Sequence, residues 1–281
     1  MNLLEYWVAR AVLATPALAP LYARLLDLAV PRLRRIAVHN LALAGYDESD
    51  RKRIADGVFR SIARLISAFA MFPKMSPKTI HRWIRYEGLE HFAAAAARGR
   101  GVLVATGHLG NWELSAFAHA WMTGQMNIVV RPLDNPKIDA LVARRRAMSG
   151  NNIISKREAA RGILRALEKG EAVGILIDQN TSPEEGVFVD FFGMKACAGT
   201  AFGKFAHRTG AAVVPGFALW LEKERRYALR FYPEIEMSGD IQADTQRIHS
   251  FLESVIREHP DQWLWIHRRW KTRPAGEPPL Y

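Results

Sequence analysis

The chain has 281 residues, of which 49% are hydrophobic and 24% charged, so it can bury a substantial core and is not disordered by composition. Its 39 lysine and arginine residues outnumber 28 acidic residues, and the net charge of +11 favours an acidic partner: nucleic acid, an anionic membrane surface, an acidic protein or a phosphorylated substrate. The single cysteine, Cys197, excludes an intrachain disulfide and a cysteine-cluster zinc site, which indicates a reducing compartment.

Residues 1–45 form an apolar and basic segment that we predict to be helical. Its uncharged run, 11–23, is shorter than the roughly 20 residues that a spanning helix needs, and Pro16 and Pro20 interrupt it. A secretory signal is a second possibility, although Glu5 lies where such a signal carries positive charge. Trp7 and several leucines beside arginines favour a helix lying in a bilayer surface. Packing of this helix against its own domain is an equally good explanation.

Residues 46–281 alternate helical and extended patterns without a linker, and we predict one α/β domain. Strands separated by helices form a mostly parallel central sheet that helices cover on both faces. The last two predicted strands pair antiparallel. Predicted helices cover 47–71, 87–98, 111–122, 136–148, 157–169, 199–208 and 241–259, and predicted strands cover 102–105, 127–130, 153–154, 172–177, 211–221 and 227–232.

The strongest chemical signal is GHLGNWE at 107–113, where a predicted strand turns into a predicted helix. In an unbroken helix His108 and Glu113 would lie about 140° apart and would not meet. The two glycines permit a turn, so both side chains can converge at the carboxyl end of the strand. A carboxylate that accepts a hydrogen bond from one imidazole nitrogen leaves the other free to take a proton from a hydroxyl. The structural alternative is a turn histidine followed by a favourable first-turn charge.

This motif resembles the His-x4-Asp/Glu motif of glycerolipid-type acyltransferases. Together with RPLDNP at 131–136, VFVDFFGMKACAGTAFGKFAHRTGAAVVPGF at 187–217 and QWLWIHRRWKTRP at 262–274, it resembles the bacterial lipid A biosynthesis (lauroyl/myristoyl) acyltransferases over about residues 7–274. The resemblance implies transfer of a fatty acyl chain from acyl carrier protein to a hydroxyl of a lipid A precursor of the Kdo-lipid IVA type. His108 would be the general base and Glu113 would orient it.

The resemblance also implies work at the cytoplasmic face of the inner membrane. Members of that family commonly carry a longer N-terminal membrane segment, so we expect peripheral or monotopic attachment here. Acyl carrier protein, a phosphorylated glycolipid acceptor and an anionic membrane surface are all negative, which accounts for the net charge without nucleic acid. No metal or cofactor is expected, because a thioester has a good leaving group and backbone amides can hold the oxyanion.

Further polar residues follow predicted strands and are candidate substrate-binding residues. Arg131 follows the second strand, where it can bind a phosphate or sugar acid or simply pair with Asp134, and Asn135 lies in the turn that follows. Asp178 and Gln179 follow the strand at 172–177. Asp178 can orient the substrate or an arginine, or cap a turn, and we weigh these interpretations evenly.

Gly199 and Thr200 open a predicted helix whose free backbone amides can bind an oxyanion or phosphate, although any helix start offers the same groups. Phe188, Phe191 and Phe192 are candidates for the wall of an acyl channel, or for core. The interleaved tryptophans and basic residues of 263–273 fit either single-stranded nucleic acid or a membrane headgroup zone.

Three functional classes follow from these patterns. An acyltransferase would use the histidine on an acceptor hydroxyl, with another glycolipid or a lysophospholipid as alternative acceptors. A lipid esterase or thioesterase would use the same residues on water. A nucleic-acid-binding module is the third class, but the sequence has no helix-turn-helix, zinc or RNA-recognition motif. Acyl chain length and the acceptor hydroxyl are not readable from these motifs.

Overall fold

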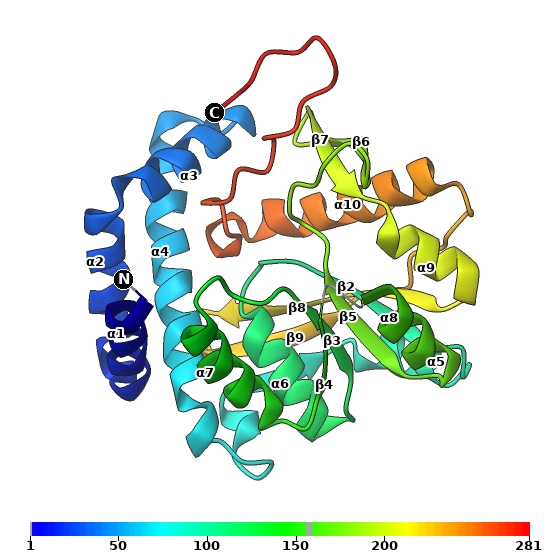
Figure 1. The fold of residues 1–281 in the computed structure, drawn as a ribbon, viewed down its shortest axis with the longest axis horizontal. Helices are drawn as coiled ribbons and strands as arrows, with labels where there is room; N and C mark the ends of the chain where they lie inside the picture. The colour runs from blue at the N-terminus through cyan, green and yellow to red at the C-terminus, as the bar shows by residue number, and fades with distance from the viewer. Residues whose placement is uncertain (1, 156–158) are drawn as a thin grey trace.

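The computed structural model describes residues 2–155 and 159–281, and it has the predicted α/β architecture (Figure 1). Seven strands form the central sheet in the order β1-β9-β8-β2-β5-β3-β4, and every pairing is parallel except that of β8 with β9. The strands are β1 (Ile84–Glu87), β2 (Val102–Thr106), β3 (Asn127–Val130), β4 (Asn152–Ser155), β5 (Ala172–Leu176), β8 (Ala212–Leu221) and β9 (Arg226–Phe231).

The helices lie close to the predicted ranges, and part of the predicted 157–169 helix lies outside the described residues. They are α1 (Asn2–Ala14), α2 (Ala19–Ala29), α3 (Pro31–Leu43), α4 (Glu48–Met71), α5 (Leu89–Ala96), α6 (Trp112–Met122), α7 (Pro136–Ala147), α8 (Ala159–Glu168), α9 (Ala201–Thr209) and α10 (Ile241–Glu258). Asp47 caps α4 and Asn111 caps α6, each accepting a hydrogen bond from a backbone amide three residues on.

The side chains of β2 show why both faces of the sheet are covered. Val102 and Val104 pack in a core with α5 and α6, whereas Leu103 and Ala105 pack in another core with α8, α9 and α10. Successive side chains of a strand point to opposite faces, so a continuous apolar run marks a strand buried on both sides. This arrangement leaves the carboxyl ends of the parallel strands free to carry a site.

Two elements differ from the sequence prediction. Residues 84–87 form the edge strand β1, parallel to β9, and α5 begins only at Leu89 after Gly88 adopts a left-handed φ of 65°. A separate hairpin of β6 (Gly186–Phe191) and β7 (Met194–Gly199) was not predicted. It packs against α10 instead of joining the main sheet, so its aromatic residues are buried from one side by a helix far along the chain.

The N-terminal helices α1, α2 and α3 pack along α4 at one edge of the molecule (Figure 1). The predicted boundary at 45 falls in the turn between α3 and α4. In the described residues no single helix is long and apolar enough to cross a membrane. Only the two helical segments 3–14 and 16–29 taken together have the length and apolar composition of a span, and the chain bends by 98° between them.

Candidate active site

His108 and Asp178 meet at the carboxyl ends of two neighbouring strands. β2 and β5 pair in parallel from Val102 to Thr106, so the turns after them lie side by side. The His108 Nδ1 lies 2.9 Å from one Asp178 carboxylate oxygen, and the His108 backbone amide donates to the other at 2.9 Å. Gly107 permits this approach, because a Cβ there would lie 3.2 Å from the Asp178 carboxyl carbon.

The surroundings of this pair favour an ionised aspartate and a basic imidazole. Burial alone would lower the pKa of His108, but the adjacent Asp178 carboxylate, and more weakly Glu113, raise that pKa above its ordinary 6.5. Burial would raise the pKa of Asp178, but the imidazole and hydrogen bonds from His108 and Trp263 hold it well below its usual range. The carboxylate thus fixes the proton on Nδ1 and leaves the His108 Nε2 available to accept another.

A pocket of about 1070 Å³ opens over His108, with Asp178 buried behind it. His108 and Gln179 line it, with the Gln179 Nε2 3.5 Å from the His108 Nε2. Its apolar walls include Val104 and Phe117 from one core and Ile163 and Phe202 from the other, so a hydrocarbon chain in it would contact apolar side chains. The lining therefore combines a proton acceptor with apolar walls.

Comparison with known proteins identifies the family of this chain. Residues 4–272 match the family model described as bacterial lipid A biosynthesis acyltransferase. The chain belongs to this family. It is 31% identical over 289 aligned residues to a lipid A biosynthesis palmitoleoyltransferase of Escherichia coli strain K12, covering 100% of this chain and 92% of the relative. It is 30% identical over 256 residues to the lauroyltransferase of that organism, covering 89% and 83%, and 25% identical over 248 residues to its myristoyltransferase, covering 87% and 77%. The protein is an acyltransferase.

Glu113 differs from its predicted place in this acyltransferase. We predicted that the Glu113 carboxylate accepts a hydrogen bond from one imidazole nitrogen, but Asp178 accepts that bond, from Nδ1. Glu113 lies at the second residue of α6 and binds Arg146 of α7 through both carboxylate oxygens, at 2.9 and 2.5 Å. Both side chains are mostly buried and line the pocket. Glu113 therefore acts on His108 through space, while Arg146 anchors α7 beside the site.

Glu113→Ala is expected to lower the free energy of unfolding by roughly 3 kcal/mol, because the mostly buried Arg146 guanidinium loses its only ion-pair partner among the described residues. Glu113→Gln retains an oxygen that accepts from Arg146 and should cost clearly less. Urea denaturation of the purified variants measures both values. Midpoints equal to that of the natural protein for both variants would contradict a stabilising role for this pair.

The other predicted binding residues fall into two groups. Arg131, Gln179, Gly199 and Thr200 line the pocket. Arg131 is 77% exposed and lies 3.6 Å from Asp134, a loose pair that leaves the guanidinium accessible. The Thr200 backbone amide and hydroxyl both donate to the Glu185 carbonyl, so this amide does not serve as the free donor that we predicted.

Asn135 and Asp178, which we predicted as candidate substrate-binding residues, are both buried and hydrogen-bonded within the protein. Asn135 is buried and lies outside the pocket lining. Its side-chain oxygen caps α7, and its amide donates to Glu5 of α1 at 2.8 Å. Asp178 is 3% exposed, and its two oxygens accept from His108 and Trp263. Asn135 therefore joins the N-terminal helices to the pocket rim, and Asp178 acts on the histidine.

Residues 262–272, which we call the C-terminal strap, hold both site turns in place. At the His108 turn, the Gly110 amide donates to the Gln262 carbonyl and the Leu264 amide donates to the His108 carbonyl. At the second turn, the Trp263 indole donates to Asp178 at 2.8 Å. The strap therefore fixes the distance between the imidazole and the carboxylate, and its His267 also lines the pocket.

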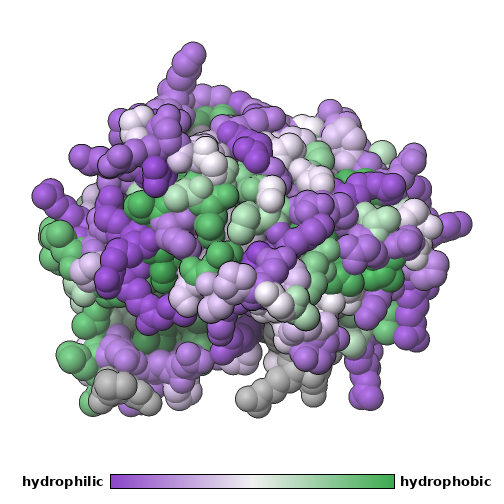
Figure 2. All heavy atoms as spheres, turned by 90° about the horizontal axis from the view of Figure 1, so that it is seen from above, coloured by the Kyte–Doolittle hydropathy of each residue, from purple (hydrophilic) through white to green (hydrophobic). Residues whose placement is uncertain are grey.

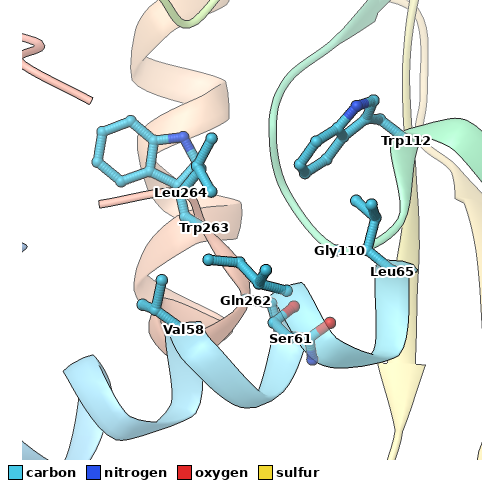
Figure 3. A pocket seen from close by; sticks show the side chains of 9 residues that line it. Val58, Ser61, Leu65, Gly110, Trp112, Gln262, Trp263 and Leu264 are labelled. Atoms are coloured by element: carbon cyan, nitrogen blue, oxygen red, sulfur yellow. The ribbon is translucent and has the colours of Figure 1, made fainter. Parts of the chain in front are cut away.

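The packing behind the His108 turn is close. Figure 3 shows a second pocket between α4, the turn at Gly110 and the strap, with Val58 and Ser61 of α4 facing Trp263 and Leu264. Its volume is about 10 Å³, room for one water at most. The turn therefore has little freedom to move away from Asp178.

The aromatic residues of the C-terminal block are core, which corrects both interpretations of their sequence pattern. Trp263, Trp265 and Trp270 are at most 1% exposed and pack on Phe191 and Phe192 of the hairpin. Because these three rings are buried, they offer no surface to nucleic acid or to lipid headgroups. The two phenylalanines likewise are core and not part of the pocket wall.

Proposed function

We propose that this protein transfers a fatty acyl chain from acyl carrier protein to a hydroxyl of a lipid A precursor of the Kdo-lipid IVA type. The observation that carries the proposal is the His108–Asp178 pair in a large pocket with apolar walls, in a chain of the lipid A acyltransferase family. The Glu113 carboxylate stabilises the positive charge that His108 acquires, because it raises the pKa of the imidazole. Arg131 lines the pocket and is suited to bind a phosphate or sugar acid of the acceptor.

The chemistry requires no protein nucleophile. The His108 Nε2 takes the proton from the acceptor hydroxyl while the hydroxyl oxygen attacks the thioester carbonyl carbon. Collapse of the tetrahedral intermediate breaks the carbon–sulfur bond, and the thiolate takes the proton from the imidazolium. The products are an O-acylated glycolipid and the free thiol of the carrier protein. Asp178 stays ionised throughout and stabilises the positively charged imidazole.

Product analysis with purified protein tests this function. With radiolabelled acyl carrier protein thioester and a purified tetra-acylated lipid A precursor, we expect one additional ester-linked chain on the glycolipid. Release of free fatty acid with no acylated glycolipid would contradict the proposal and indicate a thioesterase. Acylation of a lysophospholipid in preference to the glycolipid would assign a different acceptor.

Attachment of α1 and α2 to the cytoplasmic face of an anionic inner membrane is part of the proposal. We define the N-terminal patch as the exposed apolar residues of these helices, of the short turn between them and of the residue after α2: Leu3, Leu4, Trp7, Val8, Leu18, Leu21, Leu25, Leu28 and Val30. Exposed Arg10, Arg24, Arg32 and Arg35 flank it. Figure 2 shows hydrophobic side chains gathered at the edge where Figure 1 places α1 and α2. A soluble surface rarely carries so many adjacent apolar groups, whereas a helix in a bilayer interface buries them.

The double variant Leu4→Ser/Leu28→Ser is expected to bind anionic phospholipid vesicles about tenfold more weakly, because two exposed leucines lose the free energy of burial in lipid. The double variant Met148→Ser/Ile153→Ser removes two exposed apolar side chains elsewhere and serves as control. Vesicle co-sedimentation measures the partition. Equal binding of the two double variants would contradict attachment through the N-terminal patch.

A further inference from the structure

Helices α8 and α9 present four exposed cations on one side of the molecule. Arg161 and Arg165 are four residues apart on α8, and Lys204 and Arg208 are four residues apart on α9, so each pair shares a helix face. No ion pair joins any of the four to an acid within the described part of the chain. We call these four residues the basic ridge.

The two helices place these cations on one continuous surface. Ile163 and Ala166 of α8 pack in the same core as Phe202 and Ala206 of α9, so the helices lie side by side. Beyond the end of α9 the ridge continues toward exposed Arg100, whose guanidinium lies close to Gly210. Glu168 is the single acid within the described bounds of α8 and α9. The charged side chains of these two helices are therefore mostly positive, although Glu184 and Glu185 lie near Lys204 in the pocket lining.

The basic ridge borders one end of the active-site pocket. Ala160 of α8 and Lys204 and Phe205 of α9 line that end. Arg131 and its neighbours also line the pocket, in the loop that Asn135 and Glu5 join to α1. In Figure 1, α1 and α2 lie at one edge of the molecule and α8 and α9 toward the other. The pocket therefore connects the side of the N-terminal patch to the side of the basic ridge.

We propose that the basic ridge is the docking surface for the acyl carrier protein, whereas the glycolipid acceptor enters at the α1 and α7 end. This inference rests on the proposed function. An acidic soluble protein complements four exposed cations that form no ion pair among the described residues, and docking there places its thioester at the mouth of the pocket. A bilayer against α1 and α2 leaves α8 and α9 facing water, so both substrates can occupy the pocket at once.

Charge reversal on the basic ridge tests the assignment. In Arg161→Glu/Arg165→Glu/Arg208→Glu, none of the three residues lines the pocket. The KM for acyl carrier protein thioester should rise at least about tenfold at low ionic strength with kcat largely kept, and the difference should shrink as salt is added. The control Lys52→Glu/Arg82→Glu/Lys223→Glu makes the same change in net charge at exposed cations on other elements, and its KM should stay within about twofold of the natural value.

Each alternative outcome has a distinct signature. Equal KM values for the two triple variants would overturn the docking surface. Loss of binding to anionic vesicles by the ridge variant, with its KM unchanged in detergent, would assign the ridge to the membrane instead. If the natural protein transfers no acyl chain, the proposed function fails. Binding of unloaded acyl carrier protein, measured by fluorescence anisotropy, still tests the ridge in that case, since its loss in the ridge variant alone supports docking and equal binding overturns it.

Discussion

His108→Gln is expected to lower kcat for acyl transfer by about 10³-fold, because glutamine cannot take the proton from the attacking hydroxyl. The substitution should leave the fold intact, since Asp178 keeps its hydrogen bonds from the backbone amide of residue 108 and from the Trp263 indole. Rates with the acyl carrier protein thioester and the glycolipid measure the loss. Circular dichroism and the thermal midpoint verify folding. A folded variant with near-natural turnover would remove His108 from the mechanism.

Asp178→Asn should lower kcat by about 10²-fold or more and move the acid limb of the pH–rate profile to lower pH. In the natural protein Asp178 raises the pKa of His108 above 6.5, so the deprotonated, active base predominates only at pH values above that raised pKa. Without the carboxylate, burial lowers the pKa, so the base stays deprotonated to lower pH. The lower kcat of Asp178→Asn then arises because no carboxylate stabilises the imidazolium that His108 forms during the reaction, and not because His108 is protonated before the reaction.

The profile of Glu113→Gln is the matched comparison for this prediction. Glu113 raises the pKa of His108 only through space, and its carboxylate binds Arg146. The acid limb of the Glu113→Gln pH–rate profile should therefore shift to lower pH as well, but by less than that of Asp178→Asn. A larger shift for Glu113→Gln than for Asp178→Asn would instead support the sequence-based expectation that Glu113 orients the histidine.

The comparison of Glu113 with Asp178 shows what local spacing could and could not predict. The GHLGNWE turn, the strand before it and the helix after it follow from residues adjacent in sequence, and they were predicted. Asp178 was placed at the correct end of its strand, but its partner was not predicted. Pairing it with His108 requires knowing that β2 and β5 are neighbours, and one sequence does not reveal strand order. Arg146 likewise reaches Glu113 from a later helix.

The C-terminal strap shows a second limit. Tryptophans interleaved with basic residues are typical of exposed binding surfaces, yet Arg269 is fully buried and donates to the Cys197 carbonyl at 2.7 Å. Its burial depends on the hairpin of β6 and β7, whose carbonyl accepts the bond and whose Phe191 ring faces the guanidinium. Composition alone gives no sign of that neighbour, so the strap and its role in holding Asp178 emerge only from the structure.

Mass spectrometry of lipid A from a cell that lacks this protein is the most direct test of the account. We predict a lipid A with one secondary acyl chain fewer, restored by the natural gene and not by a gene carrying His108→Gln. An unchanged lipid A profile in the deleted strain, or full restoration by the His108→Gln gene, would contradict it.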